Sequence, residues 1–491
     1  MQIHDGEKQS ETTVSVDDVD LDLQAEENEA RERLQDLKKR HGATWNGIDD
    51  PEDPFNWPAA RKISIAITMS IGQLVTLMSA SIVAAALGDI ARDLNIDPST
   101  SQLTFSSYYL GLAFGPFFIA AISEMNGRRN IWLASNIWFI LWNTLYPVGK
   151  SKGLLISGRI LAALVVDMYP SKYRGRSLAL ASLSYLGPAL GPIIGGLLTQ
   201  LLAWPYLFYV VSIFNAVITF LGFFIVKESY TPVLLQRKRA KQSMSEGHDL
   251  MHSKTSTWAA RRDIASRFLA HFTRPFAQLI QRPIVHVISF SLALEFGIYS
   301  LILSIYATLW IDRYGQSQLI SSLHYISISI GTTASAQAGG RFLDYVYRRL
   351  RRRNNGVGKP EFRAPCMVPA ALLIPAGLLL YGWSAQHRLY FIAVDIGAAV
   401  FTCGAFMFTE AVLAYLLDEF SEHGASANAA SRSLSYILGF VFPLFAPQLY
   451  DRLDYGWGNS VLTLVWVVLG FPIPVLLWLF GEKLRARGRK D

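Results

Sequence analysis

The sequence predicts an all-helical protein that crosses a membrane many times. Of its 491 residues, 51% are hydrophobic and only 17% are charged, and the apolar residues gather in long blocks. About 20 apolar residues in helical form span a hydrocarbon core of roughly 30 Å, and most blocks reach that length. The twelve apolar segments are approximately 63–87, 103–123, 131–148, 154–166, 177–202, 206–226, 284–310, 319–342, 364–384, 389–417, 425–449 and 460–480.

The fourth segment, 154–166, is shorter than the others. As a helix it covers about 20 Å of a core of roughly 30 Å. We interpret the difference as a deletion of about a dozen residues, either natural or introduced by an error in the gene sequence. The predicted architecture therefore contains a shortened fourth helix.

Lysine and arginine are concentrated in one set of loops. The most basic stretches are 227–282, 341–363 and 483–490, whereas loops 88–102 and 312–318 carry few such residues. Because cytoplasmic loops hold an excess of Lys and Arg, both termini and the long central loop are predicted to face the cytosol. The formal net charge of +7 then lies beside anionic lipid headgroups, and no nucleic acid is expected as a partner.

The central loop divides six apolar segments from six others. The first residues are polar, acidic and poor in aromatics, a composition that does not bury enough surface to fold alone. The expected organisation is a disordered cytosolic tail over 1–53, a six-helix bundle over 54–226, a cytosolic loop over 227–283, a second six-helix bundle over 284–481 and a basic cytosolic tail over 482–491.

Several kinds of chemistry are not expected. The two cysteines, Cys366 and Cys403, lie in apolar segments and offer neither a disulfide framework nor a metal cluster. The sequence contains no phosphate-binding G-x-x-x-x-G-K-[ST] loop, and no nucleophile and base stand at a readable spacing. We therefore expect no cofactor, no metal and no enzymatic activity, and any pumping must be driven by an ion gradient.

Glycine and proline recur in the fifth segment in an unusual pattern. Three of the glycines are four residues apart, so on a helix they form one bare face against which another backbone can close. Proline within a membrane helix frees a carbonyl, which is tolerated where neighbouring helices satisfy it. A general packing face is the simpler interpretation. The residues concerned are Gly187, Pro188, Gly191, Pro192, Gly195 and Gly196.

The complete pattern G-x-x-x-G-P-x-x-G-G over 187–196 resembles the fifth-helix motif of drug:proton antiporters of the major facilitator superfamily. The D-P-E-D-P-F-N-W stretch at 50–57 is similar to the entry sequence of fungal members. The resemblance implies a major facilitator fold of two six-helix bundles. It also implies a monomeric, multi-pass plasma-membrane exporter of hydrophobic drugs, toxins or secondary metabolites in exchange for protons.

Two other functions stay open. A proton-coupled importer of a sugar or similar nutrient shares the same superfamily, although the antiporter-type fifth segment argues against it. A non-transporting or inactive membrane paralogue is favoured if the short fourth segment is genuine.

An acid precedes an arginine by four residues after the second segment and again after the eighth. Glu124 stands before Arg128 and Arg129, and Asp344 stands before Arg348. Each acid and its arginine lie one helical turn apart at the predicted cytosolic edge. The simpler interpretation is ordinary positive charge in inner loops. The resemblance implies a cytosolic gate that latches the two bundles.

Charged residues within apolar segments are costly and mark function or bundle packing. Glu295 and Glu410 lie well inside segments seven and ten. Each is predicted either to handle protons, since a desolvated carboxyl group takes up and releases a proton, or to serve as a hydrogen-bonded strut. The resemblance implies that Arg159, in the fourth segment, takes part in proton coupling. Otherwise its side chain extends to the membrane surface.

The cargo would be recognised between the two halves at the level of the membrane midplane. Aromatic rings and side-chain amides are candidates there, although packing is the usual role of such residues in membrane helices. The candidates are Tyr108, Tyr109, Asn136, Asn143, Tyr185, Tyr299, Tyr306 and Phe406. No particular ligand follows from them.

Overall fold

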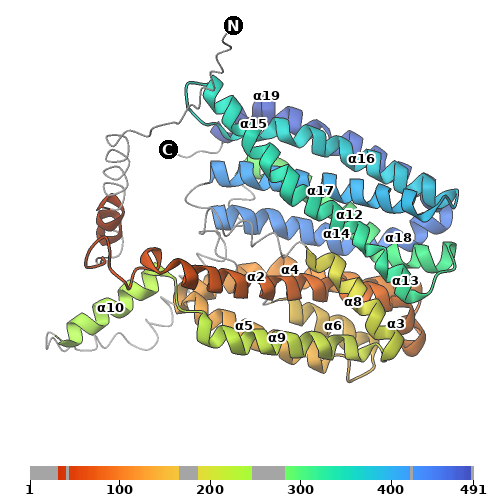
Figure 1. The fold of residues 1–491 in the computed structure, drawn as a ribbon, viewed down its shortest axis with the longest axis horizontal. Coiled ribbons are helices and arrows are strands. Elements are labelled where there is room, and N and C mark those ends of the chain that lie inside the picture. The colour runs from red at the N-terminus through yellow and green to blue at the C-terminus, as the bar shows by residue number, and fades with distance from the viewer. Residues whose placement is uncertain are drawn as a thin grey trace, which may run out of the picture. The chain divides into compact units, whose positions relative to one another are not determined.

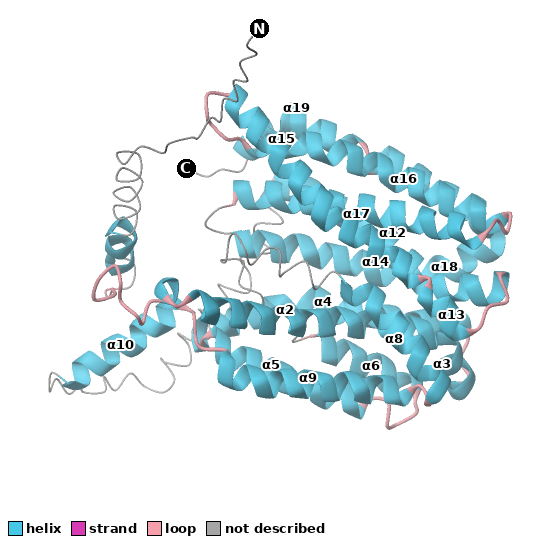
Figure 2. Ribbon diagram, in the orientation of Figure 1, coloured by secondary structure: helices cyan, strands magenta, loops and turns pink. Residues whose placement is uncertain are grey.

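The structure is a computed structural model that describes residues 31–39, 42, 44–164, 186–245, 282–420 and 424–487. Helices joined by turns and short loops make up this part of the chain, and it contains no strand (Figure 2). The prediction of an all-helical protein is confirmed. Tyr185, a predicted cargo residue, and the side chain of Glu124, a predicted gate residue, lie outside what the structure describes.

The chain divides into two compact units. The smaller combines Met1–Lys62 with Glu228–Thr257, and the larger combines Ile63–Lys227 with Trp258–Asp491. The larger unit contains the membrane helices and the candidate site.

The helices of the first half run side by side (Figure 1). Asp97 begins one of them, since its carboxylate accepts hydrogen bonds from the hydroxyl and the amide of Thr100. These bonds hold the pKa of Asp97 below its usual range. The helices are α2 (Ala59–Ser81), η2 (Ile82–Ala86), α3 (Leu87–Leu94), α4 (Pro98–Asn126), α5 (Arg128–Leu145), α6 (Lys152–Ala163), α8 (Gly187–Leu201) and α9 (Pro205–Ile225).

The second half repeats the arrangement. One assigned helix, α18, contains a break at Asp454, whose φ of 55° and ψ of 178° are not helical, so α18 is two helices in succession. The helices are α12 (Pro283–Thr308), η4 (Leu309–Arg313), α13 (Gln318–Leu323), α14 (Tyr325–Ala334), η5 (Ser335–Gly339), α15 (Gly340–Arg353), η6 (Pro360–Arg363), α16 (Ala364–Gln386), α17 (Phe391–Glu419), α18 (Gly424–Leu469) and α19 (Pro472–Ala486).

Six stretches of the described chain are long and apolar enough to cross a membrane. The last one contains the break at Asp454 and is long enough for two crossings. Some of the twelve predicted segments hold described helices of fewer than about 20 residues, and segments 154–166 and 177–202 are described only in part. Among these helices are α6, with 12 residues, and α8, with 15. The six stretches are Ala59–Leu94, Pro205–Ile225, Pro283–Arg313, Pro360–Gln386, Phe391–Glu419 and Ser431–Ala486.

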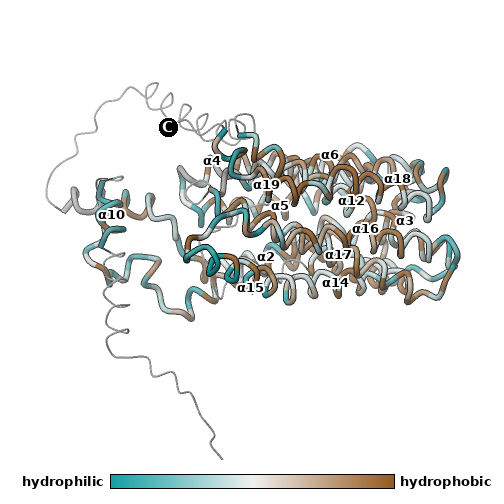
Figure 3. Tube along the Cα trace, turned by 90° about the horizontal axis from the view of Figure 1, so that it is seen from above, coloured by the Kyte–Doolittle hydropathy of each residue, from teal (hydrophilic) through white to brown (hydrophobic). Residues whose placement is uncertain are grey.

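Large apolar side chains are exposed along the outer helices. On α9, Ile213, Phe220 and Phe224 are each 65% exposed. Figure 3 shows apolar residues along the helices, whereas α15 and α10 (Thr231–Ser245) are largely hydrophilic. An apolar surface of this kind suits contact with lipid, because lipid chains form no hydrogen bonds with side chains.

Two pairs of contacts join the halves of the larger unit. In the first, α4 packs against α18, where the Ser433 hydroxyl donates to the Ala113 carbonyl over 2.7 Å. In the second, α8 packs against α13 and α14. The side chain of Gln318, which opens α13, donates to the carbonyl of Ala85 and to a carboxylate oxygen of Asp89. The interface therefore involves α4 and α8 from one half and α13, α14 and α18 from the other.

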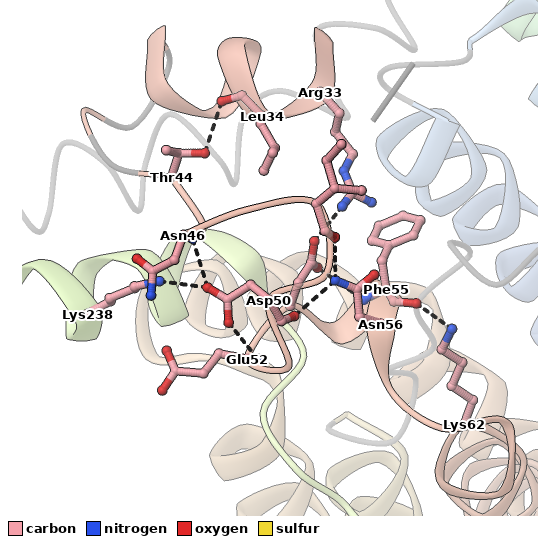
Figure 4. A network of polar contacts seen from close by, with 12 residues as sticks. Arg33, Leu34, Thr44, Asn46, Asp50, Glu52, Phe55, Asn56, Lys62 and Lys238 are labelled. Atoms are coloured by element: carbon pink, nitrogen blue, oxygen red, sulfur yellow. Dashed lines mark hydrogen bonds and ion pairs between the residues drawn. The ribbon is translucent and has the colours of Figure 1, made fainter. Parts of the chain in front are cut away.

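The smaller unit joins the start of the chain to the central loop (Figure 4). Asp50 accepts hydrogen bonds from the amides of Asn46 and Glu52 and forms a 2.9 Å ion pair with Lys238 of α10. Burial opposes the charge of Asp50, but these bonds hold its pKa below the usual range. The ammonium of Lys238 also lies 5.2 Å from the buried ring of Trp45. The residues described before position 54 thus include the helical stretch 31–39 and the turns around Asp50.

Candidate functional site

The glycine face of α8 lies against α2 and η2. A methyl group added at Gly187 would stand 2.8 Å from the Leu74 carbonyl oxygen, and one at Gly195 would stand 2.7 Å from that of Ile82. At Gly191 the added carbon would meet both the Ser81 hydroxyl and the Met78 carbonyl. Real Cβ atoms do not approach other atoms this closely, so each position requires glycine. The recurrence of glycine every four residues places all three on this one face.

The same helix also touches the other half. A carbon added at Gly196 would collide with the Ser322 side chain of α13. Pro188 lies in the first turn of α8, where a missing N–H leaves no bond unmade, whereas Pro192 lies inside the helix. Gly191 and Gly195 thus face the helix's own half, and Gly196 faces the other half. Helix α8 therefore packs closely against both halves, so any movement of one half relative to the other must change its contacts.

Arg159 is fully buried, and its side chain does not reach the membrane surface as one interpretation had it. Its guanidinium donates to the carbonyls of Ala80 and Phe105, over 3.1 and 3.3 Å, and lies 5.0 Å from the Tyr108 ring. The acceptor at Ala80 is available because α2 ends at Ser81 and tightens into the 3₁₀ helix η2. Nε has no hydrogen-bond partner among the described residues. A permanently charged group is thus held mainly by neutral carbonyls, which is a costly arrangement.

Glu295 is buried between α12 and α17. The Thr409 hydroxyl donates to its Oε2 over 2.8 Å, and the positive charge of Arg432 lies within electrostatic reach. Glu410, the next residue after Thr409, points elsewhere: its Oε2 lies near Gly339 of η5. The two carboxyl groups are therefore in different environments, although sequence alone treats them alike.

Aromatic rings meet where α4, α12 and α18 come together. Tyr109 contacts Phe296 edge to face, with ring centroids 5.4 Å apart, and stacks on Tyr436 at 6.5 Å. Tyr299 contacts Phe406 of α17 at 5.4 Å. Of the predicted cargo residues, Tyr109, Tyr299 and Phe406 lie in this aromatic cluster between the halves.

Other predicted cargo residues bond within their own half. The Asn143 amide donates to the Phe208 carbonyl and the Ser212 hydroxyl, and it accepts from Tyr146. Asn136 donates to the Trp132 carbonyl of its own helix. Both amides serve packing in this structure.

The predicted acid–arginine pair of the second half does not form between side chains. Arg348 donates to the main-chain carbonyl of Asp344, while the Asp344 carboxylate pairs at 3.6 Å with Arg363. Arg363 also pairs at 2.9 Å with Asp418 at the end of α17. Spacing along one helix predicted the wrong partner, because Arg363 comes from the following η6.

In the first half, Arg129 holds the end of α9. It donates to the carbonyls of Val226 and Phe223 over 2.8 and 2.9 Å. These are orphan carbonyls at a helix C-terminus, where a cation is favourable. Arg128, beside it, is half-buried.

Sequence reasoning missed Thr409, Phe296, Tyr436 and Arg363. All four reach their partners from other helices or from a later part of the chain. Serine and threonine inside apolar segments are the one available signal for a residue such as Thr409, because their hydroxyl needs a partner in lipid.

A family model described as Major Facilitator Superfamily matches residues 69–443. The chain therefore belongs to this superfamily, and the resemblance seen in its motifs is confirmed. It is a multi-pass membrane transporter and not an enzyme.

Curated fungal proteins align over most of the chain. A probable efflux pump, mfs2, of Aspergillus flavus is 35% identical over 417 residues, which are 82% of this chain and 98% of the relative. The efflux pump vrtL of Penicillium aethiopicum is 32% identical over 463 residues, 91% of this chain and 90% of the relative.

Solved structures show the same fold at low sequence identity. The proton:xylose symporter XylE, bound to 6-bromo-6-deoxy-D-glucose, matches with a TM-score of 0.60 and 16% identity, over 86% of this chain and 96% of its own. A partially occluded, inward-open XylE from E. coli matches with a TM-score of 0.59. At this identity the likeness supports the major facilitator fold alone, which confirms the predicted architecture.

Proposed function

We propose that this transporter exports hydrophobic small molecules, such as drugs, toxins or secondary metabolites, in exchange for protons. Relatives named as efflux pumps cover nearly its whole length, which supports the direction of transport. The aromatic cluster around Tyr109 and Phe296 offers ring faces to an apolar cargo.

The observation that carries proton coupling is the burial of Glu295. Glu295 is 5% exposed, and its carboxyl group lies between helices of the second half, with a hydroxyl as its hydrogen-bond donor. Burial penalises the charged form of a carboxyl group, whereas contact with water or a new hydrogen-bond donor favours it. A small change in helix packing or water access during the cycle therefore suffices to load or release a proton.

The gate and the location belong to the same proposal. Asp344 and Arg348, with Arg128, Arg129 and Glu124, are proposed to lie at the cytosolic edge. We propose that both termini are cytosolic, that the membrane is the plasma membrane and that the protein acts as a monomer.

The test is accumulation of a panel of fluorescent lipophilic compounds in yeast that lacks its own major pumps. Expression of the full chain is expected to lower accumulation of some of them, and a protonophore to abolish the difference. Glu295→Gln keeps size and hydrogen bonding but cannot release a proton, so it is expected to abolish export at normal expression. The matched control is Glu482→Gln, whose side chain is 74% exposed.

Three results would contradict the proposal. Export that persists with the protonophore excludes proton coupling. Uptake in place of export favours an importer. A well-expressed chain that changes the accumulation of no compound favours an inactive paralogue.

A further inference from the structure

A histidine at the junction of α13 and α14 has an oxygen acceptor at each ring nitrogen. His324 Nδ1 lies 2.8 Å from Oδ2 of Asp395 on α17, and Nε2 lies 2.9 Å from the amide oxygen of Gln316. The His324 side chain is 9% exposed and that of Asp395 is 21% exposed. The pair is thus largely enclosed, while its carboxylate still reaches solvent.

Aromatic residues complete the enclosure. The Trp310 ring of η4 stacks on the imidazole, with centroids 3.6 Å apart and planes 9° apart. Phe391 meets the imidazole edge to face at 5.7 Å. Tyr306 of α12 donates to the second oxygen of Asp395 over 2.9 Å, so each carboxylate oxygen has a donor.

This arrangement suits a doubly protonated imidazole. A neutral histidine ring has one donor and one acceptor, whereas the imidazolium donates from both nitrogens. Here both nitrogens face oxygens, one of them a carboxylate, and the face of an indole covers the ring. A cation over an indole face is stabilised by the electrons of the ring.

Other charged and titratable groups lie near the site, and two of them pair with each other. Arg313 of η4 pairs at 2.9 Å with Asp454 and donates to the Gln386 carbonyl. Arg388, in the loop before α17, and Asp395 both act electrostatically on Tyr314. Asp312 acts electrostatically on Tyr455 of α18, and His387 stacks on Trp383. Asp395 is the carboxylate in direct contact with His324.

The site connects to the contact between the two halves. His324 directly follows α13, and α13 carries Ser322, which packs on Gly196 of α8. At the other end of α13, Gln318 reaches Ala85 and Asp89. A change at His324 therefore acts on a six-residue helix that touches the first half at both of its ends.

We propose that His324 and Asp395 form a proton-binding site that holds α13 against the first half and so closes the outer side of the transporter. In the doubly protonated ring, Nδ1–H ties the junction of α13 and α14 to Asp395 of α17, and Nε2–H ties it to Gln316 in the loop before α13. Loss of the proton leaves one nitrogen facing an oxygen without a hydrogen between them, and the junction loosens. The site is separate from Glu295, and the proposal rests on the proton-coupled cycle proposed above only for its role in transport.

Proton binding is measured directly by NMR on the full chain in lipid nanodiscs with ¹⁵N-labelled histidine. The signals of His324 are identified by their loss in His324→Gln. They are expected to show a hydrogen on both ring nitrogens at the acid end of a pH series and on one of them at the alkaline end. In Asp395→Asn the hydrogen on the second nitrogen is expected to be lost at a lower pH, since a neighbouring carboxylate favours the cation. His387→Gln, which alters another histidine stacked on a tryptophan, is expected to leave the transition in place.

Closure is measured by cross-linking cysteines placed at Asp89 and Gln318, which lie on opposite halves. The yield is expected to be high when His324 is protonated, to fall as the pH rises through its transition and to lose this dependence in His324→Gln. Cysteines at Trp383 and Ser460, whose side chains bond within the second half, correct for the pH dependence of thiol reactivity.

The outcomes separate the two proposals, because neither measurement needs a cargo. A His324 signal that does not change with pH, or a cross-link that follows pH equally in His324→Gln, overturns the site even if the chain exports drugs. If Asp395→Asn does not fold, the proposal is decided by the cross-linking yield of the cysteine pair with His324 intact, compared with the yield in His324→Gln. A titrating, closing site in a chain that exports nothing upholds this inference and overturns the proposed function.

Discussion

Arg159 is a cation that stays charged at any pH the cell provides, yet its partners are carbonyl groups and a tyrosine ring. Partial negative charges on carbonyls offset only part of the cost of desolvating a guanidinium. A residue kept solely for stability would be replaced at a gain by an apolar one of similar size. We therefore attribute its burial to transport.

Arg159→Gln is expected to lower export by at least about tenfold, equivalent to roughly 1.4 kcal/mol in the limiting step. Its thermal stability is expected to be unchanged or higher, because a costly buried charge is removed. The measurements are compound efflux and thermal unfolding of purified protein. Arg159→Lys is expected to fail as well, since an ammonium does not bridge Ala80 and Phe105 in the same geometry. Arg92→Gln, at a side chain that is 77% exposed, is the control. If Arg159→Gln loses thermal stability and its export falls in proportion to that loss, the role of Arg159 is packing.

At this scale, sequence reasoning succeeds where one residue stands out from its own segment. Arg159 and Glu295 are charged residues in apolar surroundings, and the cost of burial makes them visible. Their partners are not visible, because Thr409 is 114 residues from Glu295 and the carbonyls around Arg159 come from α2 and α4. The pairing of His324 with Asp395 escaped for the same reason, since the two residues are 71 positions apart and each lies near a segment end.

Among the elements, α8 shows how close approach of two helices depends on the absence of side chains. Its glycines meet carbonyl oxygens of α2 and η2 at distances that exclude a methyl group. Where such a helix must slide or tilt during transport, bulk is expected to impair movement before it impairs insertion.

Gly191→Leu is expected to abolish export, and Gly191→Ala to reduce it, with both proteins present in the membrane. The added carbon meets the Ser81 hydroxyl and the Met78 carbonyl, so α8 is pushed away from α2. Efflux is measured against surface expression. Gly88→Leu is the control, because a side chain there meets open space. Equal loss of protein and export would show that this face serves folding alone.

The elements themselves were predictable where periodicity sufficed. Spacing by four residues predicted the bare face of α8, and apolar length predicted most helices. Spacing failed for Asp344, since its partner Arg363 is brought near by the turn into η6 and not by the period of α15. The sequence also could not predict which helices pack against α8, because a face without side chains does not specify what covers it.

For the whole molecule, the decisive feature is that the two halves meet through packed helices, and polar bonds among the described residues join these helices at separate points. Besides Gln318 and Ser433, the Gln448 amide of α18 donates to the Ser99 hydroxyl of α4 over 3.0 Å at an exposed position. Twelve apolar segments and a basic central loop predicted two halves, but no pattern in the sequence indicates which helices meet across them.

A short bifunctional maleimide joining cysteines at Ser99 and Gln448 is expected to stop export, because alternating access requires the halves to separate at this point. Export in reconstituted vesicles is compared before and after cross-linking. Each single-cysteine variant, treated identically, controls for labelling and for the native Cys366 and Cys403. Undiminished export after complete cross-linking would mean that these helix ends do not separate in the cycle.

The ion pair between Asp50 and Lys238 also has a consequence for biosynthesis. Its two residues are 188 positions apart, and the first six membrane segments lie between them. At about 5–20 residues per second, a ribosome needs roughly 10 to 40 s to make that stretch. Trp45 and Asp50 therefore leave the ribosome early and have no partner in α10 until that helix has been made. The small unit can assemble only when half of the transporter has been synthesised. Its assembly therefore always follows the synthesis of the first six membrane segments.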